Sequence, residues 1–209
     1  MPFTILLTGF GPFPGAPYNP TGTLVNMLAR RRDGTHRIAH IFATSYAAVD
    51  RDLPALLSRT QPDALVMFGL AQRTKHLRIE TVARNALSLA HADVSGVLPA
   101  ASEIAPGGPA SMRLRAPGRR LMDASLKAGV TAALSRDAGS YLCNYLCWRA
   151  SEAAQAPRAP RLVAFVHVPN VSPVRIPASP RRRGPPATVG DLAKAGEAIV
   201  QAALTSLRR

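Results

Sequence analysis

Hydrophobic residues along this chain fall into short apolar runs of strand length that alternate with segments of helical spacing. The apolar runs occupy residues 3–8, 37–44, 64–69, 77–83, 130–134 and 162–168. Helical spacing of apolar positions occurs over residues 20–31, 46–58, 118–126 and 188–207, and from about Tyr141 onward. Strands that alternate with helices through short links predict an α/β fold around a mainly parallel sheet. A chain of 209 residues can bury one sizeable core, so we expect a single domain over residues 1–209.

Two segments depart from this pattern. Between residues 86 and 117 the periodicity weakens and proline and glycine become frequent, which indicates a long excursion in the form of a loop or a short hairpin. Loops of this length in compact domains are usually functional or mobile. Residues 172–186 contain five prolines and four arginines, so we expect an irregular, mobile segment there.

The first apolar run leads into Gly9-Phe-Gly-Pro-Phe-Pro-Gly15, which holds too much glycine and proline for regular structure. Open α/β sheets bind ligands at the carboxyl ends of their strands, where this loop is expected. Phe10 and Phe13 would be exposed there unless something covers them. Both are candidates for the walls of an apolar pocket, and ordinary packing within the loop is an equal alternative.

A glycine-bearing turn, Asp137-Ala-Gly-Ser140, precedes the helical segment that begins near Tyr141. Cys143 is therefore expected in the first turn of a helix. Unpaired N–H groups and the helix dipole stabilise an anion there and lower the pKa of a thiol. The same N–H groups can hold the oxyanion of a tetrahedral intermediate. The alternative is that Cys143 is one more small buried apolar residue, as most free cysteines are.

Cys147 follows Cys143 by one helical turn, on the same face. Two cysteines at this spacing are a poor disulfide framework and too few ligands for a closed zinc site. A shared redox or metal role is the weaker alternative, because no acidic or histidine cluster accompanies them in the sequence. We expect Cys147 to pack in the core and no metal to be bound.

Two further polar residues stand where apolar ones are expected. Glu80 lies inside a strand pattern, and His167 ends a buried strand just before Val168 and Pro169. A glutamate buried in an apolar strand is costly without a partner, whereas a single histidine there is more often a satisfied core residue. Together with Cys143 they supply a nucleophile, a base and an anionic group that orients the base, the division of labour seen in cysteine and serine hydrolases.

Composition and charge limit the other function classes. No apolar run approaches the roughly 20 residues that span a bilayer, and the first residues read as a strand rather than a signal peptide. We therefore expect a cytoplasmic protein without a membrane segment.

The net charge of +14 suggests nucleic-acid binding, but arginine runs occur only at 30–32 and 181–183, and aromatic residues are 5% of the chain. Aromatic residues do not interleave with these runs, as they would in a protein that stacks the bases of a single strand. We therefore expect no specific nucleic-acid partner.

Several short blocks resemble one known family. They are Thr8-Gly-Phe-Gly-Pro-Phe13 with Asn19-Pro20, Gly69-Leu-Ala, Ile79-Glu80 with Asn85, Ala138-Gly-Ser-Tyr-Leu-Cys-Asn144, and Phe165-Val-His-Val-Pro169. In this order and near this spacing they are similar to pyroglutamyl-peptidase I, a family of cytoplasmic cysteine exopeptidases also called pyrrolidone-carboxylate peptidases. The resemblance runs over most of the chain, and the cysteine and histidine blocks are its most specific parts.

The resemblance implies an open α/β/α sandwich, a homodimer or homotetramer, and no metal or organic cofactor. It implies that Cys143 is the nucleophile, His167 the general base and acid, and Glu80 the residue that orients His167. The substrate implied is a peptide with an N-terminal pyroglutamyl residue. Its lactam ring carries no ammonium group, so an apolar slot suits it. We assign this substrate-binding role to Phe10, Phe13, Thr44, Tyr141 and Leu142.

Two departures from the family pattern keep alternatives open. The family usually carries an arginine at the position of Ala90, and a glycine pair where this chain has Gln72-Arg73. A related amidase with a different acyl specificity, or a weakly active homologue, is the first alternative. A basic nucleic-acid-binding protein on the same scaffold is a weaker one, because it leaves the ordered blocks unexplained.

Overall fold

The apolar runs of the sequence form the strands of one six-stranded sheet, with helices on both of its faces. The computed structural model describes residues 2–171, 186 and 188–208. The segment 172–186, expected to be irregular and mobile, lies outside the described residues except for Pro186. Over the described residues the elements are β1 (Thr4–Phe10), α1 (Pro20–Ala29), β2 (His36–Phe42), α2 (Tyr46–Thr60), β3 (Ala64–Leu70), β4 (Leu77–Glu80), β5 (Val82–Arg84), β6 (Ser111–Arg113), α3 (Gly118–Lys127), β7 (Ala132–Ser135), α4 (Leu142–Ala153), β8 (Leu162–Val168) and α5 (Val189–Leu207).

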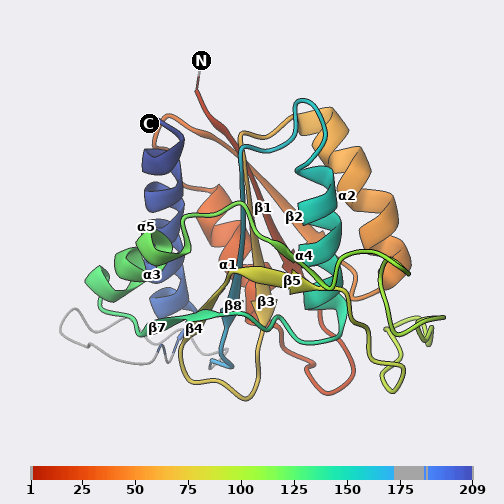
Figure 1. The fold of residues 1–209 in the computed structure, drawn as a ribbon. Coiled ribbons are helices and arrows are strands. Elements are labelled where there is room, and N and C mark those ends of the chain that lie inside the picture. The colour runs from red at the N-terminus through yellow and green to blue at the C-terminus, as the bar shows by residue number, and fades with distance from the viewer. Residues whose placement is uncertain (1, 172–185, 187, 209) are drawn as a thin grey trace.

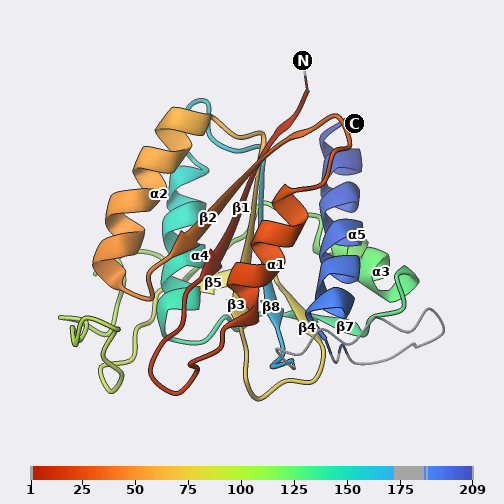
Figure 2. The same cartoon turned by 180° about the vertical axis from the view of Figure 1, so that it is seen from behind.

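The strand order across the sheet is β2-β1-β3-β8-β4-β7. Neighbouring strands are parallel except for β4, which runs antiparallel to β8 and parallel to β7. Helices α1, α3 and α5 cover one face, and α2 and α4 cover the other (Figures 1 and 2). The predicted mainly parallel sheet in an α/β/α sandwich is therefore confirmed.

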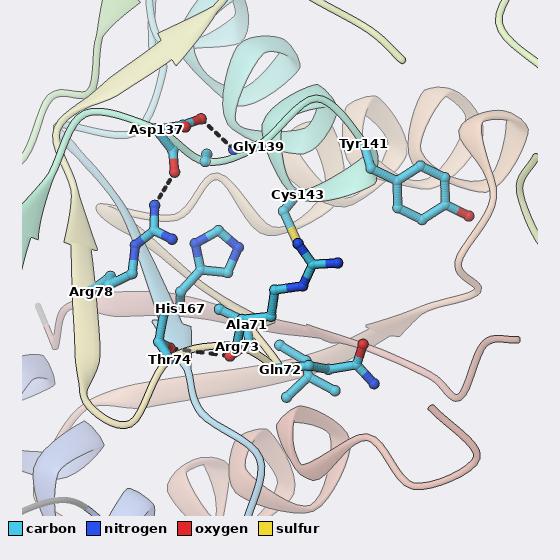
Figure 3. Close-up of a pocket in the computed structure, with 12 residues that line it drawn as sticks. Ala71, Gln72, Arg73, Thr74, Arg78, Asp137, Gly139, Tyr141, Cys143 and His167 are labelled. Atoms are coloured by element: carbon cyan, nitrogen blue, oxygen red, sulfur yellow. Dashed lines mark hydrogen bonds between the residues drawn. The ribbon is translucent and has the colours of Figure 1, made fainter. Parts of the chain in front are cut away.

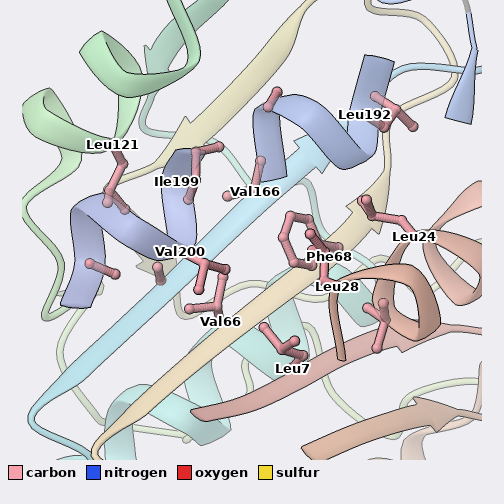
Figure 4. Close-up of a cluster of buried hydrophobic side chains, with 14 of the residues drawn as sticks. Leu7, Leu24, Leu28, Val66, Phe68, Leu121, Val166, Leu192, Ile199 and Val200 are labelled. Carbon is pink, nitrogen blue, oxygen red and sulfur yellow. The ribbon is translucent and has the colours of Figure 1, made fainter. Parts of the chain in front are cut away.

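The two faces of the sheet carry separate apolar cores because successive strand residues point to opposite sides. On one face, Val66 and Phe68 of β3 pack with Leu24 of α1 and Ile199 of α5 (Figure 4). On the other face, Leu65 and Met67 of β3 join the cluster formed with α2 and α4. Cys147 belongs to this second cluster and is fully buried, as expected from the sequence.

Two boundaries differ from the sequence expectation. The single strand predicted over 77–83 is divided at Thr81, whose N–H donates to the carbonyl of Ser135 while β5 leaves the main sheet. Strand β5 pairs antiparallel with β6, so the 86–117 excursion returns as a small two-stranded ribbon (Figure 1). Strand β1 continues to Phe10 in register with Phe42, so the glycine-rich loop starts later than predicted. Backbone pairing with β2 outweighs the glycine content at this point.

Side chains fix the starts of the helices that flank the sheet. The Asn19 side chain accepts a hydrogen bond from the N–H of Thr21, with Pro20 at the first helical position of α1. Thr188 and Asp191 form a capping box at the start of α5. None of the described helices has the length and apolar content that crossing a bilayer requires.

A buried ion pair ties the edge strand β2 to α5. The guanidinium of Arg37 donates to both carboxylate oxygens of Glu197 at 2.7 and 2.8 Å, and also to Asp33. Burial acts to raise the pKa of Glu197, but hydrogen bonds from Arg37 and Gln201 outweigh it and lower the pKa. A carboxyl with a depressed pKa contributes stability above its unfolded-state pKa and loses it as pH falls through the folded value.

We expect Glu197→Gln to destabilise the fold by about 1–2 kcal/mol at pH 7, because Arg37 keeps Asp33 but loses one charged partner. The wild-type protein should lose stability faster than the variant as pH falls below about 4.5. Urea unfolding from pH 7 to 3.5 measures both. Parallel pH dependences in the two proteins would contradict this assignment.

Candidate active site

The turn before α4 is held by two arginines. The carboxylate of Asp137 accepts a hydrogen bond from the N–H of Gly139 at 2.9 Å, and Gly139 has a φ of +86°, which favours glycine. Arg84 forms an ion pair with Asp137 at 2.6 Å and donates to the carbonyl of Gly139 at 3.0 Å. Arg78 donates to the carbonyl of Asp137 (Figure 3). These contacts set the direction in which the chain enters α4.

Cys143 lies in the first turn of α4, which begins at Leu142 after Tyr141 as the N-cap residue. The N-cap side chain makes no capping hydrogen bond. The first N–H groups of a helix have no intrahelical acceptor, so they and the helix dipole favour an anion at this position. The Cys143 side chain is half-buried, in contrast to the sealed Cys147. The location predicted for Cys143 is confirmed.

His167 and Glu80 meet on the face of the sheet that α4 covers. Nδ1 of His167 lies 2.8 Å from Oε1 of Glu80, and both residues are buried, with 4% and 1% of their surface exposed. With Nδ1 on the carboxylate, Nε2 is the ring nitrogen left to face the cleft that His167 lines together with Cys143. The three polar residues singled out in the sequence are therefore adjacent in the fold.

The two acidic neighbours of His167 change its proton affinity. Burial acts to lower the pKa of His167, because it disfavours the imidazolium. The charge of the Cys143 thiolate and the hydrogen bonds to Cys143 and Glu80 outweigh burial and raise the pKa to about 9. This arrangement favours the protonated imidazolium form of His167 beside the Cys143 sulfur.

Gly69 allows the thiol to approach the sheet. It pairs with His167 across β3 and β8. A Cβ added at Gly69 would lie 2.7 Å from Sγ of Cys143 and 2.6 Å from Cζ of Phe165. Both distances are shorter than real Cβ contacts, so a side chain here would displace the thiol or the Phe165 ring. The glycine inside an otherwise apolar strand was the signal for this close approach.

Two residues of the site were not selected from the sequence. Arg78 lies on the same face of β4 as Glu80, and its guanidinium is 3.1 Å from the Glu80 carboxylate. Asn144 is fully buried and binds the end of β5 and the residues just after it, accepting from the N–H of Arg84 and donating to the carbonyls of Arg84 and Ala86. The available sequence signals were positional. Arg78 stands two residues before Glu80 in the same strand, and Asn144 directly follows Cys143.

Two clefts meet at Tyr141. The first, of about 320 Å³, contains the thiol and the imidazole and is shown in Figure 3. It is lined by Leu70, Ala71, Gln72, Arg73, Thr74, Arg78, Asp137, Ala138, Gly139, Tyr141, Cys143 and His167. The second, of about 440 Å³, is lined by Phe13, Pro14, Ser88, Ala90, His91, Ala92, Ser140 and Tyr141. The hydroxyl of Tyr141 donates to the carbonyl of Ala92 at 2.9 Å, which docks the 86–96 segment against the second cleft.

The residues assigned to substrate binding divide into two groups. Phe13 and Tyr141 line the second cleft. Phe10, Thr44 and Leu142 are buried and line neither cleft. The ring of Phe10 packs against Phe42, with centroids 5.9 Å apart, so for Phe10 the structure agrees with the alternative of ordinary packing.

Comparisons with known proteins identify the family of this chain. A model of the pyroglutamyl peptidase family matches residues 3–206. The pyrrolidone-carboxylate peptidase of Clavibacter michiganensis is 33% identical over 167 residues, covering 79% of this chain and 78% of that protein. Pyrrolidone-carboxylate peptidase 1 of Ralstonia nicotianae is 31% identical, covering 99% of this chain and 94% of that protein.

Solved structures extend the agreement to the fold. The pyrrolidone carboxyl peptidase from Thermococcus litoralis has a TM-score of 0.86 and 25% identity, covering 99% of this chain and 95% of that one. Pyroglutamyl peptidase I from Bacillus amyloliquefaciens has a TM-score of 0.83 and 25% identity, covering 99% and 98%. With the family model matching almost the whole length, this chain belongs to the pyroglutamyl peptidase family.

Proposed function

We propose that this chain hydrolyses the amide bond after an N-terminal pyroglutamyl residue, with Cys143 as the nucleophile. The observation that carries the proposal is the placement of Cys143 at a helix start, in one cleft with a buried histidine whose Nδ1 binds Glu80. Membership of the family supports the substrate class, because the relatives are named pyrrolidone-carboxylate peptidases.

The reaction follows from the three groups. The Cys143 thiolate attacks the carbonyl carbon of the amide that links pyroglutamate to the next residue. N–H groups at the start of α4 stabilise the oxyanion that forms. The imidazolium of His167 gives its Nε2 proton to the amine nitrogen, the C–N bond breaks, and a thioester remains. Neutral His167 then takes a proton from water, the hydroxide attacks the thioester, and pyroglutamate leaves as the thiolate is restored. Glu80 keeps the ring oriented through both steps.

The second cleft is the proposed site of the lactam ring. Phe13 and Tyr141 supply aromatic side chains to its lining, and no carboxylate is among the described residues that line this cleft. An uncharged ring with amide groups suits such a site. Ala90 also lines it, and this is the position where the family usually carries arginine. A related amidase with a broader acyl specificity therefore stays a second candidate, which a panel of lactam and acyl amides distinguishes.

We further propose that the protein is cytoplasmic and forms a homodimer or homotetramer, as the resemblance implies. Light scattering coupled to size-exclusion chromatography measures the assembly.

Cys143→Ala should lower the release of fluorophore from a pyroglutamyl aminocoumarin by at least about a thousandfold, because the nucleophile is removed. Iodoacetamide should inactivate the wild-type enzyme by alkylating the same sulfur. Cys147→Ala is the matched control, since that thiol is sealed in the core. Full activity in Cys143→Ala would refute the proposal.

Above about pH 9 we expect kcat to fall, because His167 loses the proton that the leaving amine needs. Glu80→Gln should lower kcat about a hundredfold or more and move this basic limb to lower pH, because a neutral amide no longer stabilises the imidazolium. The stability that His167 contributes is fully present below pH 6.5 and is lost as pH rises through about 9. Complete pH–rate profiles of both proteins test this, and an unmoved limb would contradict the role of Glu80.

Gly69→Ala should lower kcat by about ten- to a hundredfold with a smaller change in KM, because the added Cβ displaces the Cys143 thiol. Gly22→Ala on α1 is the control, since a Cβ there meets its nearest atom at 3.8 Å. Thermal melts of both variants separate loss of folding from misplacement of the thiol. Equal kinetics for the two variants would show that the close approach at Gly69 has no catalytic consequence.

A further inference from the structure

Arg73 places a cation at the catalytic cleft that the mechanism above does not use. It lies in the loop between β3 and β4 and lines the same cleft as Cys143 and His167. Its side chain extends across the cleft in the direction of Cys143 (Figure 3). Arg73 is exposed and makes no hydrogen bond or ion pair with any other residue that the structure describes.

The other charged residues that line this cleft already have partners. Arg78 is paired with Glu80, and Asp137 is paired with Arg84 at 2.6 Å. Their charges are therefore largely balanced within the protein. The charge of Arg73 is the unbalanced one among the ionic side chains around this cleft, so an anion entering it meets a net attraction.

The chemistry of the reaction decides which part of the substrate meets Arg73. His167 protonates the leaving amine, so the leaving residue must lie on the His167 side of the thiol. Arg73 and His167 line one cleft, whereas the proposed lactam cleft lies beyond Tyr141 and contains neither of them. Arg73 consequently faces the residue that follows pyroglutamate.

We propose that Arg73 binds a carboxylate of the leaving residue and gives the enzyme a preference for anionic leaving groups. This inference rests on the proposed peptidase function. The carboxylate comes either from an acidic side chain or from the free carboxyl terminus of a pyroglutamyl dipeptide. A guanidinium suits both, because its parallel N–H groups match the two oxygens of a carboxylate.

Two matched substrate pairs separate the two sources. Pyroglutamyl-alanine and its amide differ only in the terminal carboxylate, and the amides of pyroglutamyl-glutamate and pyroglutamyl-glutamine differ only in the side-chain charge. In at least one pair, we expect kcat/KM at low salt to favour the anion by about three- to fivefold, the range of a partly exposed ion pair. The preference should shrink in 0.5 M salt.

Arg73→Gln should bring the ratio within each pair close to one, and Arg73→Glu should invert it. Lys75→Gln removes a positive charge from the same loop at an exposed position that does not line the cleft, and should leave the ratio as in the wild type. Equal rates within both pairs in the wild type, or a preference that survives Arg73→Gln, would overturn the inference.

Binding to the Cys143→Ala protein separates this inference from the proposed function. Calorimetry with the same pairs measures the carboxylate preference without turnover. A preference in binding that Arg73→Gln removes, together with no cleavage by the wild type, would leave the Arg73 site standing and reject the peptidase. Cleavage of all four substrates without any preference would do the reverse.

Discussion

The site depends on one buried hydrogen bond, between Nδ1 of His167 and Oε1 of Glu80. Both residues lie on strands of the central sheet, and both are almost fully enclosed by the apolar cluster that α4 completes. A carboxylate in such surroundings is strongly destabilised unless a donor or a cation faces it. This hydrogen bond therefore gives the buried Glu80 carboxylate a partner, and it fixes the orientation of the His167 ring at the same time.

The thiol reaches this pair because three elements converge where β3 and β8 end. Helix α4 carries Cys143 to the sheet, the turn before α4 is held by Arg78 and Arg84, and Asn144 binds the backbone after β5. Gly69 leaves the space that the sulfur occupies. A larger residue in place of Gly69 would disturb both the packing of Phe165 and the position of the thiol. Core packing and the geometry of the site therefore depend on the same glycine.

Sequence reasoning predicted most of the fold. It also singled out three residues that the fold brings to one site, because each breaks a local rule: a carboxylate in an apolar strand, a histidine at a strand end, a cysteine after a glycine turn. It failed where long-range pairing decides. Phe10 was expected in a loop because glycines flank it, yet pairing with β2 extends the strand to this residue. Thr81 sits inside one apolar run, but the ribbon with β6 divides it. Arg78 stands two residues before Glu80, but this spacing alone does not show that its guanidinium pairs with the Glu80 carboxylate.

Arg78 and His167 share one carboxylate oxygen, and this sharing bears on how readily the proton moves. Oε1 of Glu80 faces both, at 3.1 Å from the guanidinium and 2.8 Å from the imidazole, whereas Oε2 is buried without a hydrogen bond to any described residue. A carboxylate that faced His167 alone would hold the imidazolium more strongly and slow its proton transfer to the leaving amine. The fixed positive charge of Arg78 opposes that effect. In the proposed mechanism, the cation beside the carboxylate therefore lets one buried glutamate orient the ring without trapping its proton.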